Sequence, residues 1–353
     1  MSIYVDIEKT LGRFHLNVKL QGGDEVLALL GASGCGKSLT LKCIAGVERP
    51  DRGRIEVDGI TLFDSERRIN LSPQERRTGL MFQNYALFPN MTVLENIRSG
   101  ALREKDRAKR GESVMQAMEL LGLTELAAHY PSQLSGGQQQ RTALARILVS
   151  DPRILLLDEP FSALDSHLRF HLERELLHVL RRFGKTAVLV SHDRDEVFRL
   201  ADSVAVMDRG RIETVGEKKK VFAQPETRAA AILTGCKDIT RIKKIAGRRV
   251  TALDWGVELV CAADIGDAEY IGVRMHDISL GGGQNAIDCD VVDEIENPFS
   301  VTVMLRAGEN GDPFGMELDK ELWHTLRGEK VTVNIPPEQI LLLKGDTDEK
   351  DKG

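Results

Sequence analysis

From residue 31 to residue 38 the chain reads Gly31-Ala32-Ser33-Gly34-Cys35-Gly36-Lys37-Ser38. This stretch fits the pattern G-x-x-x-x-G-K-[ST]; it follows the apolar residues 26–30 and precedes a helix-like run over residues 39–45. A strand, a glycine-rich turn and a helix in this order predict a phosphate-binding loop, because backbone N–H groups and the positive end of the helix dipole then face the anion. An ordinary glycine turn is the alternative, but every fixed position and both flanks match the pattern.

Two side chains of this loop are candidates for direct work on a bound nucleotide. We expect Lys37 to reach the β- and γ-phosphates of ATP and Ser38 to offer its hydroxyl to Mg²⁺. The glycines let the backbone curl around the anion in conformations that side chains forbid. Cys35 is expected to contribute its backbone N–H rather than its sulfur.

A second candidate lies at the end of a continuous apolar run, residues 154–157, which is typical of a strand buried on both faces of a parallel sheet. The run ends at Asp158 and Glu159, where α/β sheets place their ligands. We expect Asp158 to hold Mg²⁺, and Glu159 to orient and deprotonate the attacking water. A solvated acidic pair in a turn is the alternative.

A third motif precedes a predicted helix over residues 139–149; it consists of Leu134, Ser135, Gly136, Gly137 and Gln138. The serine and the glycines place N–H groups at a helix start, which predicts a second anion site. One site cannot easily use both helix ends, so we expect them to meet across a dimer.

Length and composition limit the classes of protein. A chain of 353 residues is expected to form two or three domains. The net charge of −6 argues against a general nucleic-acid binder. No apolar run approaches the ~18 residues of a membrane span, and we see no signal peptide. The five cysteines form no metal-binding pattern and are expected to be reduced thiols in the cytoplasm.

The pattern of elements predicts a doubly wound α/β core. Apolar alternation over residues 3–7 and 14–18 predicts two antiparallel strands, and residues 186–190 a further buried strand. Residues 84–150 are expected to form a helical insertion, with a capping box at Thr92 and Glu95. Beyond residue 235 short β-like runs predict a small β-barrel domain over residues 236–353.

With these motifs the chain resembles an ATP-binding cassette (ABC) subunit of a membrane transporter over about residues 1–235. Residues 134–138 match the family's signature sequence, and residues 31–38 and 154–159 its two nucleotide motifs. Three further family motifs are matched by Gln83 for the Q-loop, Asp165 for the D-loop and His192 for the switch histidine.

The resemblance implies a mechanism. Two cassettes would sandwich two ATP molecules, each held between the phosphate loop of one chain and the signature of the other. Glu159 would be the general base, His192 would contact the γ-phosphate, and Gln83 would contact Mg²⁺ and the attacking water. Family members often stack an aromatic residue on adenine; Phe14 could do so, but it fits the alternating core face equally well.

The chain is most similar to importer subunits with a C-terminal β extension of the OB or TOBE type. Residues 233–239 resemble the junction in importers of molybdate and related oxyanions, which implies permease subunits, a substrate-binding protein and a peripheral place on the cytoplasmic face of the membrane. Sulfate, iron, polyamine or sugar cargo, or a soluble cassette protein, are the alternatives. A basic group in the extension could bind the oxyanion or form a solvated turn; it consists of Lys243, Lys244, Arg248 and Arg249.

Overall fold

The computed structural model describes residues 2–162, 166–326 and 328–346. The chain divides into two compact units, residues 1–218 and 219–353.

Unit 1 contains an eleven-stranded sheet with the order β6-β5-β4-β1-β2-β11-β10-β3-β9-β8-β7. Its strands are β1 (Ile3–Leu11), β2 (Phe14–Gly22), β3 (Val26–Leu30), β4 (Arg52–Val57), β5 (Ile60–Asp64), β6 (Ile69–Asn70), β7 (Thr78–Met81), β8 (Ile154–Asp158), β9 (Ala187–Ser191), β10 (Ser203–Asp208) and β11 (Arg211–Glu217). Its helices are α1 (Lys37–Ala45), α2 (Pro73–Arg76), α3 (Val93–Gly100), α4 (Arg107–Leu120), α5 (Gly136–Leu148), α6 (Ser166–Phe183) and α7 (Arg194–Leu200), with 3-10 turns η1 (Thr124–Leu126) and η2 (Pro131–Gln133).

The sheet has a parallel part and an antiparallel part. Strands β10, β3, β9, β8 and β7 pair in parallel, whereas β1 pairs with β2 and β4 in antiparallel register. Every residue of β3, β8 and β9 is buried, as the continuous apolar runs predict. The predicted antiparallel N-terminal strands and the α/β core are therefore confirmed.

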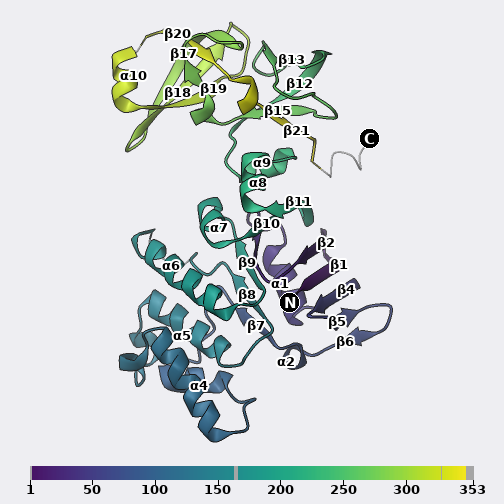
Figure 1. Ribbon diagram of the computed structural model, residues 1–353, viewed down its shortest axis with the longest axis vertical. Helices are drawn as coiled ribbons and strands as arrows, with labels where there is room; N and C mark the ends of the chain where they lie inside the picture. Colours follow the sequence, from purple (N-terminus) through teal and green to yellow (C-terminus); the bar gives the residue numbers. More distant parts are fainter. Residues whose placement is uncertain (1, 163–165, 327, 347–353) are drawn as a thin grey trace. The chain divides into compact units, whose positions relative to one another are not determined.

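Helices α3, α4 and α5 pack on one another, and α5 packs against β7. Figure 1 labels α4 and α5 of this block. The predicted capping box of α3 is present: Thr92 accepts from the backbone N–H of Glu95, whose carboxylate accepts from Thr92 in return. Helix α5 begins at Gly136, three residues earlier than the sequence predicts. Ser135 and Gln138 form a capping box there, which offsets the low helix propensity of the two glycines.

Unit 2 is an all-β, barrel-like domain with short helices, which confirms the predicted second fold class. Two five-stranded sheets have the orders β14-β13-β12-β15-β21 and β16-β20-β17-β18-β19. The strands are β12 (Asp238–Ala246), β13 (Arg249–Ala252), β14 (Val257–Val260), β15 (Tyr270–Val273), β16 (Ser279–Leu280), β17 (Ala286–Glu296), β18 (Ser300–Ala307), β19 (Phe314–Asp319), β20 (Lys330–Asn334) and β21 (Leu341–Leu343). The helices are α8 (Lys218–Ala223), which begins at the end of unit 1, α9 (Arg228–Leu233) and α10 (Lys320–Leu326), with 3-10 turns η3 (Met275–Asp277) and η4 (Pro337–Gln339).

Residues from both of these sheets contribute to one hydrophobic cluster in unit 2. The chain has two tryptophans, Trp255 and Trp323, and both are buried in this cluster. The ring of Trp255 lies 5.3 Å from that of Phe314, measured between centroids.

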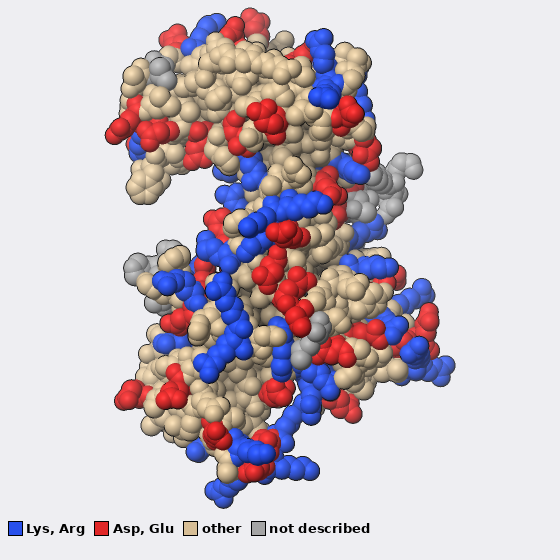
Figure 2. Space-filling model, viewed as in Figure 1, with Lys and Arg blue, Asp and Glu red and all other residues tan. Residues whose placement is uncertain are grey.

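Two surface properties bear on the partners of the chain. None of the helices in the described part of the chain combines the length and the apolar character that a membrane crossing needs. On the face shown in Figure 2, acidic and basic side chains are interspersed over both units.

Candidate functional site

Neighbouring parallel strands bring most of the sequence-predicted residues to one edge of the sheet. Strands β3, β9, β8 and β7 are adjacent in that order. The predicted phosphate loop follows β3, His192 follows β9, Glu159 follows β8 and Gln83 follows β7. Because the strands are parallel, these residues all emerge at the carboxyl ends, which is where open α/β sheets bind ligands.

The glycines of the loop are required by its geometry. Gly36 precedes α1 with φ 110°, in the left-handed region, and Gly34 has φ 81°. A Cβ atom on Gly31 would lie 2.4 Å from the backbone oxygen of Met207, which no side chain tolerates. The loop can therefore take its curled form only with glycine at these positions.

Lys37 is buried and folded back onto its own loop. Its Nζ donates to the backbone oxygens of Gly31 at 2.8 Å and of Ala32 at 2.9 Å. It also lies 3.9 Å from Sγ of Cys35, a thiol whose pKa is raised by burial. The ammonium group is thus held inside the curl of backbone that the sequence predicts to cradle phosphate.

Ser38 and Asp158, two of the residues predicted to hold Mg²⁺, are hydrogen-bonded to each other directly. Ser38 Oγ donates to Asp158 Oδ1 at 2.7 Å. Burial raises the pKa of the Asp158 carboxyl, while the bond from Ser38 lowers it and the neighbouring charge of Glu159 raises it further. A hydroxyl and a carboxylate are hard oxygen donors of the kind that suits Mg²⁺, and Gln83, which follows the adjacent strand, carries an amide oxygen of the same kind.

Glu159 and His192 form a second pair at the same edge. Nδ1 of His192 lies 3.2 Å from Oε1 of Glu159, and the carboxylate is largely shielded whereas the imidazole is half exposed. Glu159 has φ 44°, a left-handed conformation that is rare for a non-glycine residue. The backbone N–H of Glu159 donates to the carbonyl of Val190 at 3.1 Å, which links the ends of β8 and β9.

Gln83 joins this pair through Ser162. Nε2 of Gln83 donates to Ser162 Oγ at 3.1 Å, and Ser162 Oγ donates to the backbone oxygen of Glu159 at 3.0 Å. Asp165, the predicted D-loop residue, lies outside the described residues.

The predicted signature residues stand apart from this cluster. Ser135 caps α5: its Oγ accepts from the N–H of Gln138, and the Gln138 side chain accepts from the N–H of Ser135 at 2.9 Å. Among the described residues, no hydrogen bond or ion pair joins residues 134–138 to residues 31–38. The structure of one chain thus assembles the two nucleotide motifs, the Q-loop glutamine and the histidine, but not the signature.

Phe14 belongs to the core face of β2 rather than to an open surface. It is half-buried, packs against the hydrophobic core of unit 1 together with Leu16 and Val18, and lies beside Gly36. The geometry favours the core interpretation over adenine stacking.

An ionic network next to His192 was not predicted from the sequence. Glu196, which is 4 % exposed, accepts from Ser191 Oγ at 2.9 Å. Asp193 caps α7 and pairs with Arg169 at 2.9 Å. Burial, with smaller contributions from Asp193 and Glu173, raises the pKa of Glu196 to about 8. A lone glutamate in an amphipathic helix gives no signal of this kind in a sequence.

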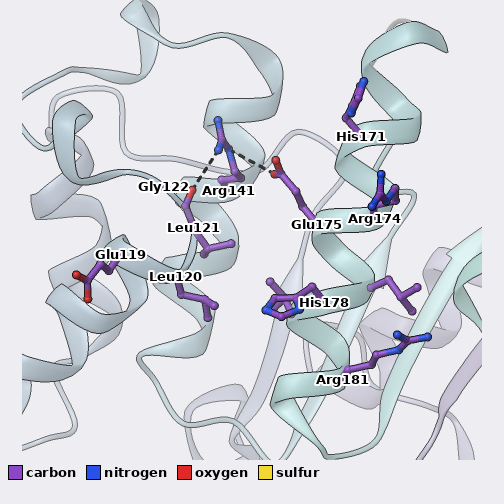
Figure 3. Close-up of a pocket in the computed structure, with 12 residues that line it drawn as sticks. Glu119, Leu120, Leu121, Gly122, Arg141, His171, Arg174, Glu175, His178 and Arg181 are labelled. Carbon is purple, nitrogen blue, oxygen red and sulfur yellow. Dashed lines mark hydrogen bonds and ion pairs between the residues drawn. The ribbon is translucent and has the colours of Figure 1, made fainter.

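A groove of about 710 Å³ runs between α4, α5 and α6 (Figure 3). Arg141 of α5 faces Glu175 of α6 across it at 3.8 Å and donates to the backbone oxygen of Leu121 at 3.2 Å. None of the predicted nucleotide-site residues lines this groove, so it is separate from the cluster described above.

The basic group of unit 2 is largely engaged with neighbouring acceptors. Arg249 pairs with Glu258 at 2.8 Å, and Arg248 lies 3.8 Å from Asp264. Lys244 donates to the backbone oxygen of Gly266 at 2.6 Å. These contacts favour a solvated basic turn over an anion site.

Sequence comparison connects the chain to proteins of known class. The family model described as "ABC transporter" matches residues 14–162. The sulfate/thiosulfate import ATP-binding protein of Chromobacterium violaceum is 42% identical over 91% of this chain and 88% of its own length. The spermidine/putrescine import ATP-binding protein of Roseobacter denitrificans is 38% identical over 79% of this chain and 77% of its own length.

The molybdenum import ATP-binding protein of Paramagnetospirillum magneticum is 41% identical over 64% of this chain and 65% of its own length. The cargoes in the names of these relatives therefore do not single out molybdate.

Solved structures give the same fold for unit 1. One is a dimeric ATP-binding cassette in a post-hydrolysis state with ADP and phosphate. Its match covers 62% of this chain and 99% of the cassette, with a TM-score of 0.52 and 29% sequence identity. A second dimeric cassette structure gives a TM-score of 0.52 and 30% identity over the same share of both chains.

Proposed function

The chain belongs to the ABC transporter family of ATP-binding proteins, and on that premise we propose that it is the ATP-hydrolysing subunit of an importer for a tetrahedral oxyanion. The observation that carries the ATPase function is the joint placement of two contacts at adjacent strand ends. Ser38 meets Asp158 at 2.7 Å, and Glu159 meets His192 at 3.2 Å. The first pair suits the metal of a nucleotide, and the second suits an attacking water.

Each residue has a proposed task. Lys37 leaves the carbonyls of its own loop and pairs with the β- and γ-phosphates. Glu159 accepts the proton of the attacking water at a carboxylate oxygen. His192 orients that carboxylate through Nδ1 and contacts the γ-phosphate, while Gln83 holds the water from the neighbouring strand end.

Mg²⁺ would be held by Ser38, Asp158 and Gln83, and it would neutralise charge on the phosphate oxygens. The direct bond between Ser38 and Asp158 shows that the first two oxygen donors already converge, which supports a single metal between them.

The active species is proposed to be a homodimer. Among the described residues, the signature residues 134–138 are not joined to the phosphate loop of the same chain, and one related cassette is dimeric in two solved structures. Each ATP would lie between the loop of one chain and the signature of its partner, so that residues Gly31–Ser38 of one copy and Leu134–Gln138 of the other complete one site.

Relatives named for oxyanions and for polyamines are both similar to the chain, and of these two classes we propose an oxyanion as the cargo. The relative that matches 91% of the chain is named for sulfate and thiosulfate, and residues 233–239 resemble the junction of oxyanion importers. Within this class we propose molybdate or tungstate, with sulfate as the first alternative and polyamines as the second. We also propose permease subunits as membrane partners at the cytoplasmic face, an ATPase domain ending near residue 235, and a C-terminal regulatory domain.

A cargo-dependent ATPase assay tests this proposal. The chain is purified with its permease partners, placed in vesicles with the cognate binding protein, and assayed with molybdate, sulfate or spermidine at equal concentration. We expect molybdate to stimulate hydrolysis most. Stimulation by sulfate alone would keep the oxyanion class and refute molybdate; stimulation by spermidine alone would refute the class.

A further inference from the structure

The backbone that follows Gln83 is held in an unusual conformation. Tyr85 has φ 59° and Ala86 has φ 45°, so two successive non-glycine residues lie in the left-handed region. Such residues persist only where the surrounding structure holds them, and they are concentrated at functional sites. The question is what holds this turn.

Arg146 of α5 holds the turn from one side. Its Nη2 donates to the backbone oxygen of Tyr85 at 3.0 Å and its Nη1 to that of Ala86 at 2.8 Å. The guanidinium carbon lies 5.3 Å from the centre of the Phe88 ring. No carboxylate in the described ranges forms an ion pair with Arg146, so its planar fork is committed to the two carbonyls of the strained turn.

Tyr85 holds the other side of the turn against the catalytic strand end. Its side chain is 5 % exposed, and its hydroxyl donates to the backbone oxygen of Pro160, the residue after Glu159, at 3.3 Å. Gln83 reaches the same segment through Ser162, whose hydroxyl donates to the backbone oxygen of Glu159. The turn is therefore tied both to α5 and to the segment that carries the proposed base.

We propose that Arg146 and Tyr85 are positioning residues that fix Glu159 relative to helix α5. The signature residues lie at the start of α5 and Arg146 lies near its end, within one continuous helix. When a nucleotide on the partner chain engages the signature, the helix moves as a rigid rod, and Arg146 and Tyr85 carry that displacement to Glu159 of the same chain. This inference rests on the proposed ATPase function and adds a route by which one site sets the base of the other.

Two conservative variants of the full-length chain test the proposal. Tyr85→Phe removes only the Tyr85 hydroxyl, and with it the hydrogen bond to the backbone oxygen of Pro160. Arg146→Lys keeps the positive charge, but an ammonium group cannot hold two carbonyls as a planar guanidinium does. Arg141→Lys, on the same helix but directed into the groove, is the matched control for loss of an arginine from α5. The measurements are kcat and KM for ATP, nucleotide affinity, melting temperature and hydrogen–deuterium exchange of the segment 159–162.

We expect kcat to fall about 3- to 10-fold in each variant, the size of one or two hydrogen bonds, with KM and nucleotide affinity within about twofold of wild type. Exchange at residues 159–162 should rise without nucleotide in both variants and not in Arg141→Lys. The kcat of the double variant should be no lower than that of the less active single variant, since both residues act through one turn.

Other results would overturn the inference. A wild-type kcat in folded Tyr85→Phe and Arg146→Lys, a loss explained wholly by weaker nucleotide binding, additive losses in the double variant, or unchanged exchange at 159–162 would each do so. If the wild-type chain itself failed to hydrolyse ATP, the proposed function would be lost, whereas the exchange measurement would still decide whether the turn holds Glu159.

Discussion

At the scale of single residues, Glu159 combines a largely shielded carboxylate with a restrained backbone. Its φ of 44° costs on the order of 1–3 kcal/mol, which the surrounding hydrogen bonds must offset. Its backbone N–H is held by Val190 and its carbonyl by Ser162, so the carboxylate is aimed by backbone contacts on both sides. Because these contacts involve only the backbone of residue 159, an uncharged side chain at this position should keep the same backbone conformation.

Replacing Glu159 with Gln is therefore expected to leave ATP binding intact and to lower hydrolysis by about 100-fold or more, the usual contribution of a general base. ATP that is bound but not cleaved should also hold the two chains together, which size-exclusion chromatography with and without ATP will detect. Glu112→Gln, an exposed change on α4, is the charge control. Hydrolysis by Glu159→Gln at the wild-type rate would remove this residue from the role of base.

At the scale of elements, the strands that are buried on both faces are the easiest to predict from the sequence. Strands β3, β8 and β9 are apolar at every or nearly every position because both faces are covered, so their patterns are readable without a structure. The sequence predicts the start of α5 three residues too late, because glycines argue against a helix, whereas the capping box formed by Ser135 fixes the start at Gly136.

The contacts of single side chains over long sequence separations were not predictable. Arg146 meets carbonyls sixty residues away, and the same arginine on a helix would normally be expected to face solvent. The short helix α10 between two strands of unit 2 was also missed, since seven residues carry too little periodicity. The sequence thus predicts the strands and motifs of the site, but not the hydrogen bonds that join them.

The packing of α7 against β9 leads to a prediction about pH. The pKa of Glu196 is raised to about 8, mainly by burial, with Asp193 and Glu173 adding to the rise and Arg169 opposing it. The folded chain therefore keeps a proton that the unfolded chain loses near pH 4.5. The stabilising contribution is complete below that pH and is lost as the pH rises through about 8.

The variant Glu196→Gln, which resembles the protonated acid, should remove this dependence. Between about pH 5 and pH 9 the free energy of unfolding of the wild type should decline relative to the variant by on the order of 4 kcal/mol. Urea unfolding followed by far-ultraviolet circular dichroism measures both, with Glu112→Gln as the exposed control. Parallel curves for wild type and Glu196→Gln would show that Glu196 is ionised in the folded chain.

At the scale of the whole molecule, one chain assembles only part of the proposed nucleotide site. The phosphate loop, the acidic strand end and His192 converge, while Ser135 and Gln138 of the signature hydrogen-bond to each other at the start of α5. A homodimer with twofold symmetry would supply the missing part twice, because each copy gives its signature to the other.

Complementation between two inactive variants tests this division. Lys37→Ala removes the phosphate lysine, and Ser135→Arg fills the signature; each alone should hydrolyse ATP at least about 10-fold more slowly than wild type. When they are mixed in equal amounts, half of the dimers are mixed and have one intact site, so recovery of up to about a quarter of the wild-type rate is expected. Full activity of Ser135→Arg by itself would show that each chain works with its own site alone.

The placement of Trp255 and Trp323 has a practical consequence. Since both tryptophans of the chain are buried in the core of unit 2, intrinsic indole fluorescence is an optical signal of that unit alone. Unit 1, which carries the proposed ATP site, has no tryptophan and gives no indole emission. A change in indole emission on adding ATP would therefore report that nucleotide binding at the proposed site alters the surroundings of the tryptophans in unit 2. This measurement needs no attached dye.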